Sequence, residues 1–271
     1  MPRRLGQHFL ADGAYAARIV RAAKVTSDDF VVEVGPGRGS LTHLLAQARP
    51  KSLTLVELDH TLAEGLRKKY TGNDQVSVIE ADARTLDVGR LPGTEVGKYK
   101  VVGNLPYYAA SPIVRNFLES RCKPSLIVVM VQREVADEMA AGEGKKGMLS
   151  LGVQMYADVE KLFEVPPSAF RPPPKVTSAV VRLTVLPQPR VAVDSEAAFF
   201  SLVRAGSRAP RKQLRNSLAL GLGASLESAG RTLARAGIEA SRRPGTLSLE
   251  EWGMLYRSWL EQAQAVPEAA P

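Results

Sequence analysis

The sequence predicts an α/β protein: a doubly wound, Rossmann-like sheet followed by a small all-helical domain. Short β-branched runs alternate with stretches of helical spacing from residue 30 onward, the pattern of parallel strands joined by crossover helices. A glycine-rich turn, Gly35-Pro36-Gly37-Arg38-Gly39, follows the first run, and beyond residue 190 only helical spacing remains. At 271 residues the chain is long enough for two domains, because single domains usually have ~100–200 residues.

In the first domain, the expected strands and helices follow one another along the chain. The β-branched runs predict strands at 30–34, 52–57, 76–79, 99–103 and 126–131. Apolar residues at helical spacing predict helices at 40–48, 61–70, 112–120 and 132–140. Two later β-rich runs, 159–163 and 179–185, predict a hairpin that closes the sheet, and the glycine-rich segment 142–147 predicts a mobile loop.

Proline-rich segments mark the rest of the organisation. Prolines remove backbone donors and fix φ, so we expect no regular structure over 165–175. A change of composition at 186–190 predicts a boundary between a domain of residues 1–186 and a helical domain of residues 191–265. Helical patterns follow at 199–205, 213–220, 226–236 and 249–263, with Ser248 as the N-cap of the last, and a frayed tail is expected at 266–271.

Composition narrows the class of partner and the compartment. The 36 Lys and Arg residues against 28 Asp and Glu give a net charge of +8, which favours a polyanionic partner such as nucleic acid, although solubility alone also explains a modest excess. The single cysteine, Cys122, excludes an intramolecular disulfide, and no apolar run has the length of a signal peptide or a membrane span. We therefore expect a cytoplasmic monomer. The three histidines lack metal-ligand spacing, so we expect no metal.

The glycine-rich turn and two later carboxylates predict an adenosine-type cofactor. Glycines at a strand-to-helix turn, here Gly35 and Gly37, allow positive φ and close approach of a ligand to backbone N–H groups. Glu57 ends the second strand about 20 residues later, where a carboxylate accepts both ribose hydroxyl protons. Asp82, at the end of the third strand, suits the adenine amino group. Dinucleotide oxidoreductases share this geometry, so these residues alone do not choose between hydride and methyl transfer.

The segment Asn104-Leu105-Pro106-Tyr107 favours methyl transfer to an aromatic amine. It follows the fourth strand, at the edge where ligands of open α/β sheets bind. Adenine N6 is a poor nucleophile, because its lone pair is delocalised into the ring. Acceptors at the Asn104 side-chain oxygen and the Leu105 carbonyl, directed at its two hydrogens, favour a tetrahedral nitrogen. Pro106 stiffens the turn and Tyr107 offers a ring for stacking.

Residues farther along the chain suit an RNA substrate. Phe170, in the proline-rich loop, is expected either to sandwich a flipped adenine against Tyr107 or to anchor its loop in the core. Its neighbours Arg171 and Lys175 suit phosphates. Between Phe199 and Gly221 there is no acidic residue, and this basic segment predicts a backbone-phosphate-binding face, with a merely solvated helix as the alternative. Its basic residues are Arg204, Arg208, Arg211, Lys212 and Arg215.

With these residues together, the chain closely resembles the ribosomal RNA adenine dimethyltransferases, specifically the bacterial enzymes that dimethylate two adjacent adenosines near the 3′ end of 16S ribosomal RNA. The resemblance covers almost the whole chain and implies a class I S-adenosylmethionine-dependent methyltransferase fold. The motifs that carry it are Leu5-Gly6-Gln7-His8-Phe9-Leu10, Glu33-Val34-Gly35-Pro36-Gly37-Arg38-Gly39, Val56-Glu57-Leu58-Asp59, Ala81-Asp82-Ala83, Asn104-Leu105-Pro106-Tyr107, Val131-Gln132-Arg133-Glu134-Val135, the segment 170–178 and the segment 211–218.

The resemblance also implies roles for individual residues. Cofactor contacts carry over onto His8, Leu10, Gly35, Glu57, Asp82 and Asn104. The target-base residues carry over onto Asn104, Leu105, Pro106, Tyr107 and Phe170. The family usually has Asn where this chain has His8, and a more basic, aromatic-led stretch where this chain has 207–212. The implied partner is 16S ribosomal RNA within an assembling small ribosomal subunit.

Three alternatives stay open at this point. The first is the antibiotic-resistance relative that modifies one adenine of large-subunit RNA, against which the motif at 211–216 argues. The second is a non-catalytic ribosome assembly or nucleic-acid-binding factor, against which the intact segment 104–107 argues. The third is a dinucleotide oxidoreductase, which shares Gly35 and Glu57 but has no use for Asn-Leu-Pro-Tyr.

Overall fold

The computed structural model of the chain describes residues 8–265 and divides them into two compact units. The tail expected to fray, 266–271, lies outside the described residues, as do residues 5–7 of the first motif. Among the described residues, the first unit comprises 8–137 and 157–187, and the second comprises 138–156 and 188–265. The second unit therefore takes up residues 138–156, which the sequence assigned to the first domain.

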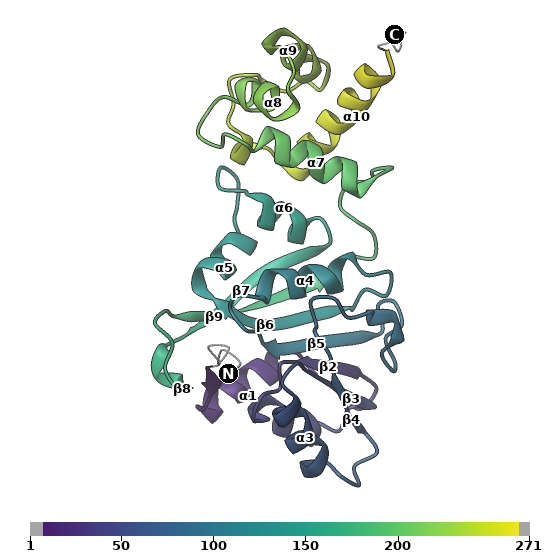
Figure 1. Cartoon of the computed structure of the whole chain (residues 1–271), viewed down its shortest axis with the longest axis vertical. Coiled ribbons are helices and arrows are strands. Elements are labelled where there is room, and N and C mark those ends of the chain that lie inside the picture. The colour runs from purple at the N-terminus through teal and green to yellow at the C-terminus, as the bar shows by residue number, and fades with distance from the viewer. Residues whose placement is uncertain (1–7, 266–271) are drawn as a thin grey trace. The chain divides into compact units, whose positions relative to one another are not determined.

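The first unit is built around a seven-stranded sheet with the strand order β4-β3-β2-β5-β6-β9-β7, as Figure 1 shows. Its parallel strands are β2 (Phe30–Val34), β3 (Ser52–Glu57), β4 (Val76–Glu80), β5 (Tyr99–Asn104) and β6 (Leu126–Gln132). The strands β7 (Ala157–Val165) and β9 (Ser178–Val185) are antiparallel to each other, and β9 is antiparallel to β6. The predicted doubly wound sheet and its closing pair of strands are confirmed.

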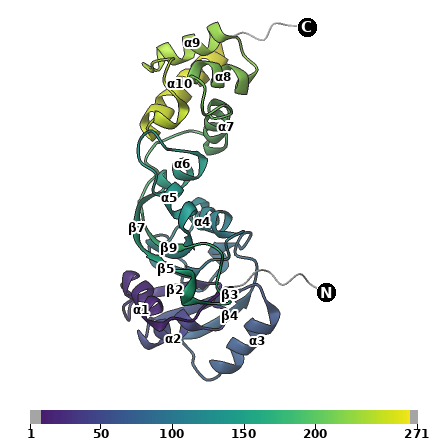
Figure 2. The same ribbon diagram turned by 90° about the vertical axis from the view of Figure 1, so that its left-hand side faces the viewer.

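Helices cover both faces of this sheet. They are α1 (Gly13–Ala22), α2 (Ser40–Gln47), α3 (His60–Lys69), α4 (Ala110–Glu119) and α5 (Arg133–Met139). Helix α1 packs beside α2 (Figure 2), and both belong to one buried cluster with Val31, Leu53, Val102 and Val128 of the strands. Figure 1 shows α4 on the opposite side of the sheet from α1 and α3. Neighbouring strand residues of opposite orientation, such as Val101 and Ile127, are buried as well, as expected of parallel strands covered on both faces.

The register of the parallel strands brings their carboxyl ends to one edge. Val34 pairs with Val56 on one side and with Gly103 on the other, and Asn104 pairs with Met130. A Cβ on Gly103 would lie 2.5 Å from the Val34 carbonyl oxygen, so only glycine allows β5 to approach β2 this closely. Since β3 and β5 flank β2, the strand order reverses there, and ligands of open α/β sheets bind beside such a switch point.

The prediction of no regular structure over 165–175 is wrong for Val165, which ends β7, and for Phe170 and Arg171. These two residues form β8 (Phe170–Arg171), which pairs antiparallel with β1 (Phe9–Leu10), after a short 3-10 turn η2 (Pro167–Ala169). The Ala169 carbonyl also accepts hydrogen bonds from the backbone N–H groups of Ala11 and Asp12, at 2.8 and 3.1 Å. Partners from a segment about 160 residues away satisfy the backbone, so the prolines do not prevent a short strand between them.

The second unit is helical within the described residues. Its helices are α6 (Met148–Gln154), α7 (Glu196–Gly206), α8 (Leu214–Leu222), α9 (Leu226–Arg235) and α10 (Leu249–Ala265). Trp252 of α10 is fully buried, and a Cβ on Gly206 would lie 2.6 Å from its ring. Ser248 caps α10 as predicted, because its hydroxyl accepts the Glu251 backbone N–H at 3.1 Å. Among residues 8–265, no helix has both the length and the apolar character to cross a membrane.

Candidate active site

A cleft opens at the carboxyl edge of the parallel strands, with an empty volume of about 1080 Å³ that includes its mouth. All eleven residues predicted to bind the cofactor or the target base line this one cleft. They are His8, Leu10, Gly35, Gly37, Glu57, Asp82, Asn104, Leu105, Pro106, Tyr107 and Phe170. Their chain positions span more than 160 residues, so the fold brings together what the sequence places on separate segments.

The floor of the cleft is the turn between β2 and α2. Gly35 and Gly37 have φ of 68° and 56°, a left-handed conformation that favours glycine. A Cβ on Gly37 would also lie 3.1 Å from the Phe9 ring. The Gly37 N–H donates to Glu57 Oε2 at 3.0 Å, and Oε1 accepts the N–H groups of Leu58 and Asp59 at 2.9 and 3.0 Å. These three bonds fix the carboxylate of Glu57 in place at the end of β3.

This arrangement fits an adenosine-type cofactor. Glu57 is an anchored acceptor, and its two oxygens have lone pairs beyond the three that are already used, as ribose hydroxyls require. The glycine turn leaves room for a ligand against the backbone. Asp82, also on the cleft wall, is the remaining predicted acceptor, and its carboxylate is bound by the Arg84 side chain, with Nε at 3.0 Å from both oxygens. This ion pair lowers the pKa of Asp82, so its carboxylate is charged at neutral pH.

Asn104 ends β5 and is oriented by the N-terminal segment. Its Nδ2 donates to the His8 backbone carbonyl at 3.3 Å. With the nitrogen engaged in this way, the other amide atom, Oδ1, is the acceptor that the side chain presents elsewhere. Leu105 follows with a buried side chain, and its N–H donates to the Met130 carbonyl of β6 at 3.1 Å. The strand end is therefore fixed through the Asn104 side chain and through the Leu105 backbone.

Tyr107 forms one wall of the cleft. Its hydroxyl hydrogen-bonds to the hydroxyl of Ser178, the buried first residue of β9, at 2.7 Å, and burial raises the pKa of the phenol. The Tyr107 ring lies 5.9 Å from the His8 imidazole, centroid to centroid. The His8 Nδ1 in turn hydrogen-bonds with the Pro172 carbonyl oxygen at 2.8 Å. The aromatic wall is thus fastened both to the sheet and to the proline-rich loop.

Phe170 is fully buried and belongs to the core cluster of the first unit, yet it also lines the cleft. The structure bears out the interpretation that Phe170 anchors its loop in the core, and it also places the residue on the lining of the cleft. A sandwich of adenine between Phe170 and Tyr107 stays a prediction.

Comparison with known protein families decides the identity of the fold. The family described as ribosomal RNA adenine dimethylase matches residues 2–253. The chain belongs to this family. A relative from Dehalococcoides mccartyi, called ribosomal RNA small subunit methyltransferase A, is 44% identical over 258 residues, which are 95% of this chain and 88% of the relative.

Solved structures agree with membership of the adenine dimethylase family. The 23S rRNA methyltransferase ErmE is 28% identical with a TM-score of 0.70, over 92% of this chain and 98% of that one. A dimethyladenosine transferase from Plasmodium falciparum, 22% identical over 94% of this chain and 98% of that one, has the same fold with a TM-score of 0.80. The predicted class I methyltransferase fold and the predicted family are confirmed.

The sequence assigned no individual role to three residues that line this adenine dimethylase cleft or support its wall. Glu33, at the buried end of β2, lines it, and burial together with repulsion from Glu57 raises the pKa of Glu33 to about 8. Arg84 holds Asp82, and Ser178 holds Tyr107. Only Glu33 had a sequence signal, since an acid within an apolar strand is rarely buried without a partner or a function.

The residues predicted to contact RNA are exposed in both units of this adenine dimethylase. Arg171 and Lys175 belong to the first unit, and the Arg171 guanidinium also donates to the Ser168 and Phe170 carbonyls. The others belong to the second unit: Arg204, Arg208, Arg211, Lys212 and Arg215. No group of three or more His, Cys, Asp or Glu residues suited to a metal occurs within 8–262.

Proposed function

We propose that this protein transfers methyl groups from S-adenosyl-L-methionine to N6 of two adjacent adenosines in the 3′-terminal loop of 16S ribosomal RNA, giving N6,N6-dimethyladenosine. One observation carries the proposal: the Asn104–Tyr107 strand end and the anchored Glu57 line the same cleft in a ribosomal RNA adenine dimethylase. The choice of the small subunit follows the Dehalococcoides mccartyi relative, whose name specifies that subunit.

The residues that hold the cofactor are those on the turn and on the ends of β3 and β4. Glu57 accepts the ribose hydroxyls, the Asp82 carboxylate accepts the adenine amino group, and Gly35 and Gly37 admit the ligand against the backbone. His8 and Leu10 cover the cleft from the N-terminal segment. When bound, S-adenosylmethionine supplies an electrophilic methyl group on a positively charged sulfur.

The target adenine is held by the strand end after β5. Asn104 Oδ1 and the Leu105 carbonyl accept the two N6 hydrogens, which favours a lone pair directed away from the ring plane. Tyr107 stacks on the base, and Pro106 limits movement of the turn. No strong base is required, because N6 becomes a strong acid once it is alkylated. Alignment of N6 with the methyl group is worth up to several kcal/mol, roughly what preorganised positioning supplies.

We further propose a division of work between the parts of the chain. Residues 1–186 bind the cofactor and the base, and residues 191–265 bind RNA through the exposed arginines and Lys212 of the basic segment. The partner is 16S ribosomal RNA in an assembling small subunit, and the protein acts as a monomer in the cytoplasm without metal or membrane. The single cysteine and the RNA substrate support this compartment.

A labelled transfer experiment tests the proposal. Tritiated methyl groups should pass from the cofactor to unmodified small ribosomal subunits, and digestion of the RNA should give N6,N6-dimethyladenosine at two neighbouring positions. Large subunits from the same cells serve as the control substrate and should stay unlabelled. The 28% identity to ErmE makes the large subunit the specific competing substrate. Label confined to large-subunit RNA would overturn the proposal.

A further inference from the structure

A second pocket lies beside the candidate active site, within the first unit. It opens where β6 passes into α5 and where the proline-rich loop passes into β9, with an empty volume of about 570 Å³. The Arg133 N–H donates to the Thr177 carbonyl at 3.0 Å and joins the two segments. The pocket, called here the flanking pocket, is lined by Gln132, Arg133, Glu134, Lys175, Val176 and Thr177.

The flanking pocket is one step along the sheet from the wall of the cleft. Gln132, the last residue of β6, pairs with Ser178, whose hydroxyl bonds to the hydroxyl of Tyr107 at 2.7 Å. Thr177, which lines the flanking pocket, directly precedes Ser178, and an extended chain advances ~3.3 Å per residue. A polymer with one base in the cleft therefore has its neighbouring unit within reach of this pocket.

The chemistry of the flanking pocket suits a ribonucleotide. Arg133 and Lys175 are exposed, and neither forms an ion pair with any residue between 8 and 262, so their charges are available to an anion. Glu134 supplies an acceptor for a hydroxyl. Val176 exposes 39% of its surface, an apolar area for a sugar or base. An inorganic anion would use only the cations, whereas a ribonucleotide uses its phosphate, its 2′-hydroxyl and its apolar faces.

We propose that the flanking pocket binds the ribonucleotide next to the adenosine held in the cleft. Arg133 and Lys175 bind its phosphate, and Glu134 accepts the 2′-hydroxyl proton. The inference rests on the proposed function, because it requires an RNA strand at the cleft. A site on the neighbour fixes the strand while one base is turned out of its stack, which offsets part of the cost of unstacking.

Coupling between a protein change and a phosphate change tests this proposal. A labelled RNA hairpin with two adjacent loop adenosines is titrated by fluorescence anisotropy, and so are hairpins in which one phosphate beside either adenosine is a neutral methylphosphonate. One neutral linkage should weaken binding by wild type about tenfold, or ~1.4 kcal/mol. The Arg133→Ala/Lys175→Ala variant should bind the unmodified hairpin as weakly as wild type binds the hairpin with the neutral linkage. In this variant the neutral linkage should weaken binding further by less than about twofold.

The matched control is Arg90→Ala/Lys98→Ala. It removes the same charge from exposed positions near the amino end of β5, at the opposite edge of the sheet. This control should remain as sensitive to the neutral linkage as wild type. Circular dichroism checks that each variant is folded, which we expect because all four side chains are exposed.

Three results would overturn the flanking-pocket proposal: a double variant as sensitive to the neutral linkage as wild type, a wild type insensitive to every neutral linkage, or no binding of the hairpin by wild type. The titration needs no turnover. The two proposals can fail separately. If the hairpin binds through this pocket but neither the hairpin nor the small subunit is methylated, the proposed function is contradicted and the flanking pocket is still supported.

Discussion

The side-chain amide of Asn104 is oriented by a hydrogen bond to a residue outside its own motif. Because the His8 carbonyl accepts from Nδ2, the side chain cannot easily turn its nitrogen toward the target base. We predict that Asn104→Ala leaves the Kd for S-adenosylhomocysteine within about threefold and lowers methyl transfer at least ~10²-fold, the effect of losing one preorganised acceptor. Calorimetry and single-turnover transfer to small subunits measure the two quantities.

Asn73→Ala is the matched control for this change. Asn73 lies in the exposed turn before β4 and bonds only locally, with Oδ1 accepting the Gln75 N–H at 3.1 Å. Transfer by this control should equal that of wild type. Wild-type turnover in Asn104→Ala would eliminate the acceptor role, and a lost affinity for S-adenosylhomocysteine would mean that Asn104 acts mainly through the cofactor contact that the resemblance implies.

Glu33 makes the stability of the first unit depend on pH. Its pKa is raised from 4.5 to about 8, first by burial and then by repulsion from Glu57. Between these pH values the folded chain holds a proton that the unfolded chain has lost, so this residue's contribution to stability falls as pH rises from about 4.5 to about 8. We predict that the free energy of unfolding of Glu33→Gln, relative to that of wild type, rises by on the order of 2–4 kcal/mol between pH 5 and pH 8.5.

Urea unfolding of both proteins at the two pH values measures this difference. The control is Glu64→Gln, at an exposed position of α3. Its free energy of unfolding relative to wild type should change by less than about 0.5 kcal/mol over the same pH range. A constant difference between Glu33→Gln and wild type would mean that Glu33 stays ionised in the folded chain.

The sequence located the residues of the cleft better than it located their partners. Glycine turns and polar strand ends occur at fixed places in a doubly wound sheet, so spacing along the chain was enough to group Gly35, Glu57 and Asn104. The bond from Asn104 to His8 joins positions 96 residues apart, and neither residue type predicts it. The burial of Phe170 depends on a core assembled from many segments, which a local pattern cannot show.

At the scale of elements, the strands of the main sheet and most helices were predicted, whereas two helices and the two shortest strands were not. Every predicted strand of the first unit corresponds to an observed one within about two residues at each end. Helices α1 and α6 were missed. The strands β1 and β8, two residues each, exist only because they pair with each other, so neither has a pattern of its own. Pairing over such a distance is a tertiary effect.

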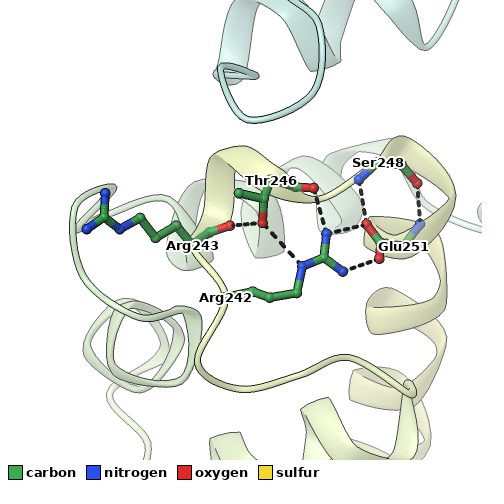
Figure 3. A network of polar contacts seen from close by, with 5 residues as sticks. All are labelled: Arg242, Arg243, Thr246, Ser248 and Glu251. Carbon is green, nitrogen blue, oxygen red and sulfur yellow. Dashed lines mark hydrogen bonds and ion pairs between the residues drawn. The ribbon is translucent and has the colours of Figure 1, made fainter.

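The start of α10 is an element whose stability depends on one carboxylate. Figure 3 shows Glu251 accepting the Ser248 N–H, at 2.8 Å, and binding the guanidinium of Arg242, which also donates to the Thr246 carbonyl at 2.6 Å. Ser248 and Glu251 thus form a reciprocal capping box. We predict that Glu251→Ala lowers the free energy of unfolding by roughly 1–3 kcal/mol, because a cap and a partly buried charge pair are lost together.

Glu227→Ala is the control for this element. Glu227 pairs with Arg231 across one turn of α9, but both side chains are more than half exposed, so the change should cost less than about 0.5 kcal/mol. Urea unfolding followed by tryptophan fluorescence reports on the second unit, because both Trp252 and Trp259 lie in α10. Equal losses of unfolding free energy in the two variants would mean that the capping box and its ion pair stabilise the chain no more than an exposed ion pair does.

At the scale of the whole molecule, the proposed division of work assigns RNA affinity largely to the second unit. Its exposed basic residues Arg211 and Lys212 form no ion pair within 8–262, so RNA phosphates are their natural partners. The expected boundary near 186–190 stays a proposal. Residues 138–156 fold with the helical unit, so a fragment ending at 186 would include a segment from that unit, and the division is best tested in the full chain.

The salt dependence of binding makes this test. Each phosphate contact to a single strand adds about 0.7 to the slope of log K against log salt, because counterions are released. We predict that Arg211→Ala/Lys212→Ala lowers that slope by about 1.4 for hairpin RNA, while Arg90→Ala/Lys98→Ala leaves it unchanged. Anisotropy titrations between 50 and 300 mM KCl, roughly the range over which such slopes are linear, measure it. An unaltered slope in the first variant would mean that these two cations do not touch phosphate, and Arg204, Arg208 and Arg215 or the first unit would then have to account for RNA binding.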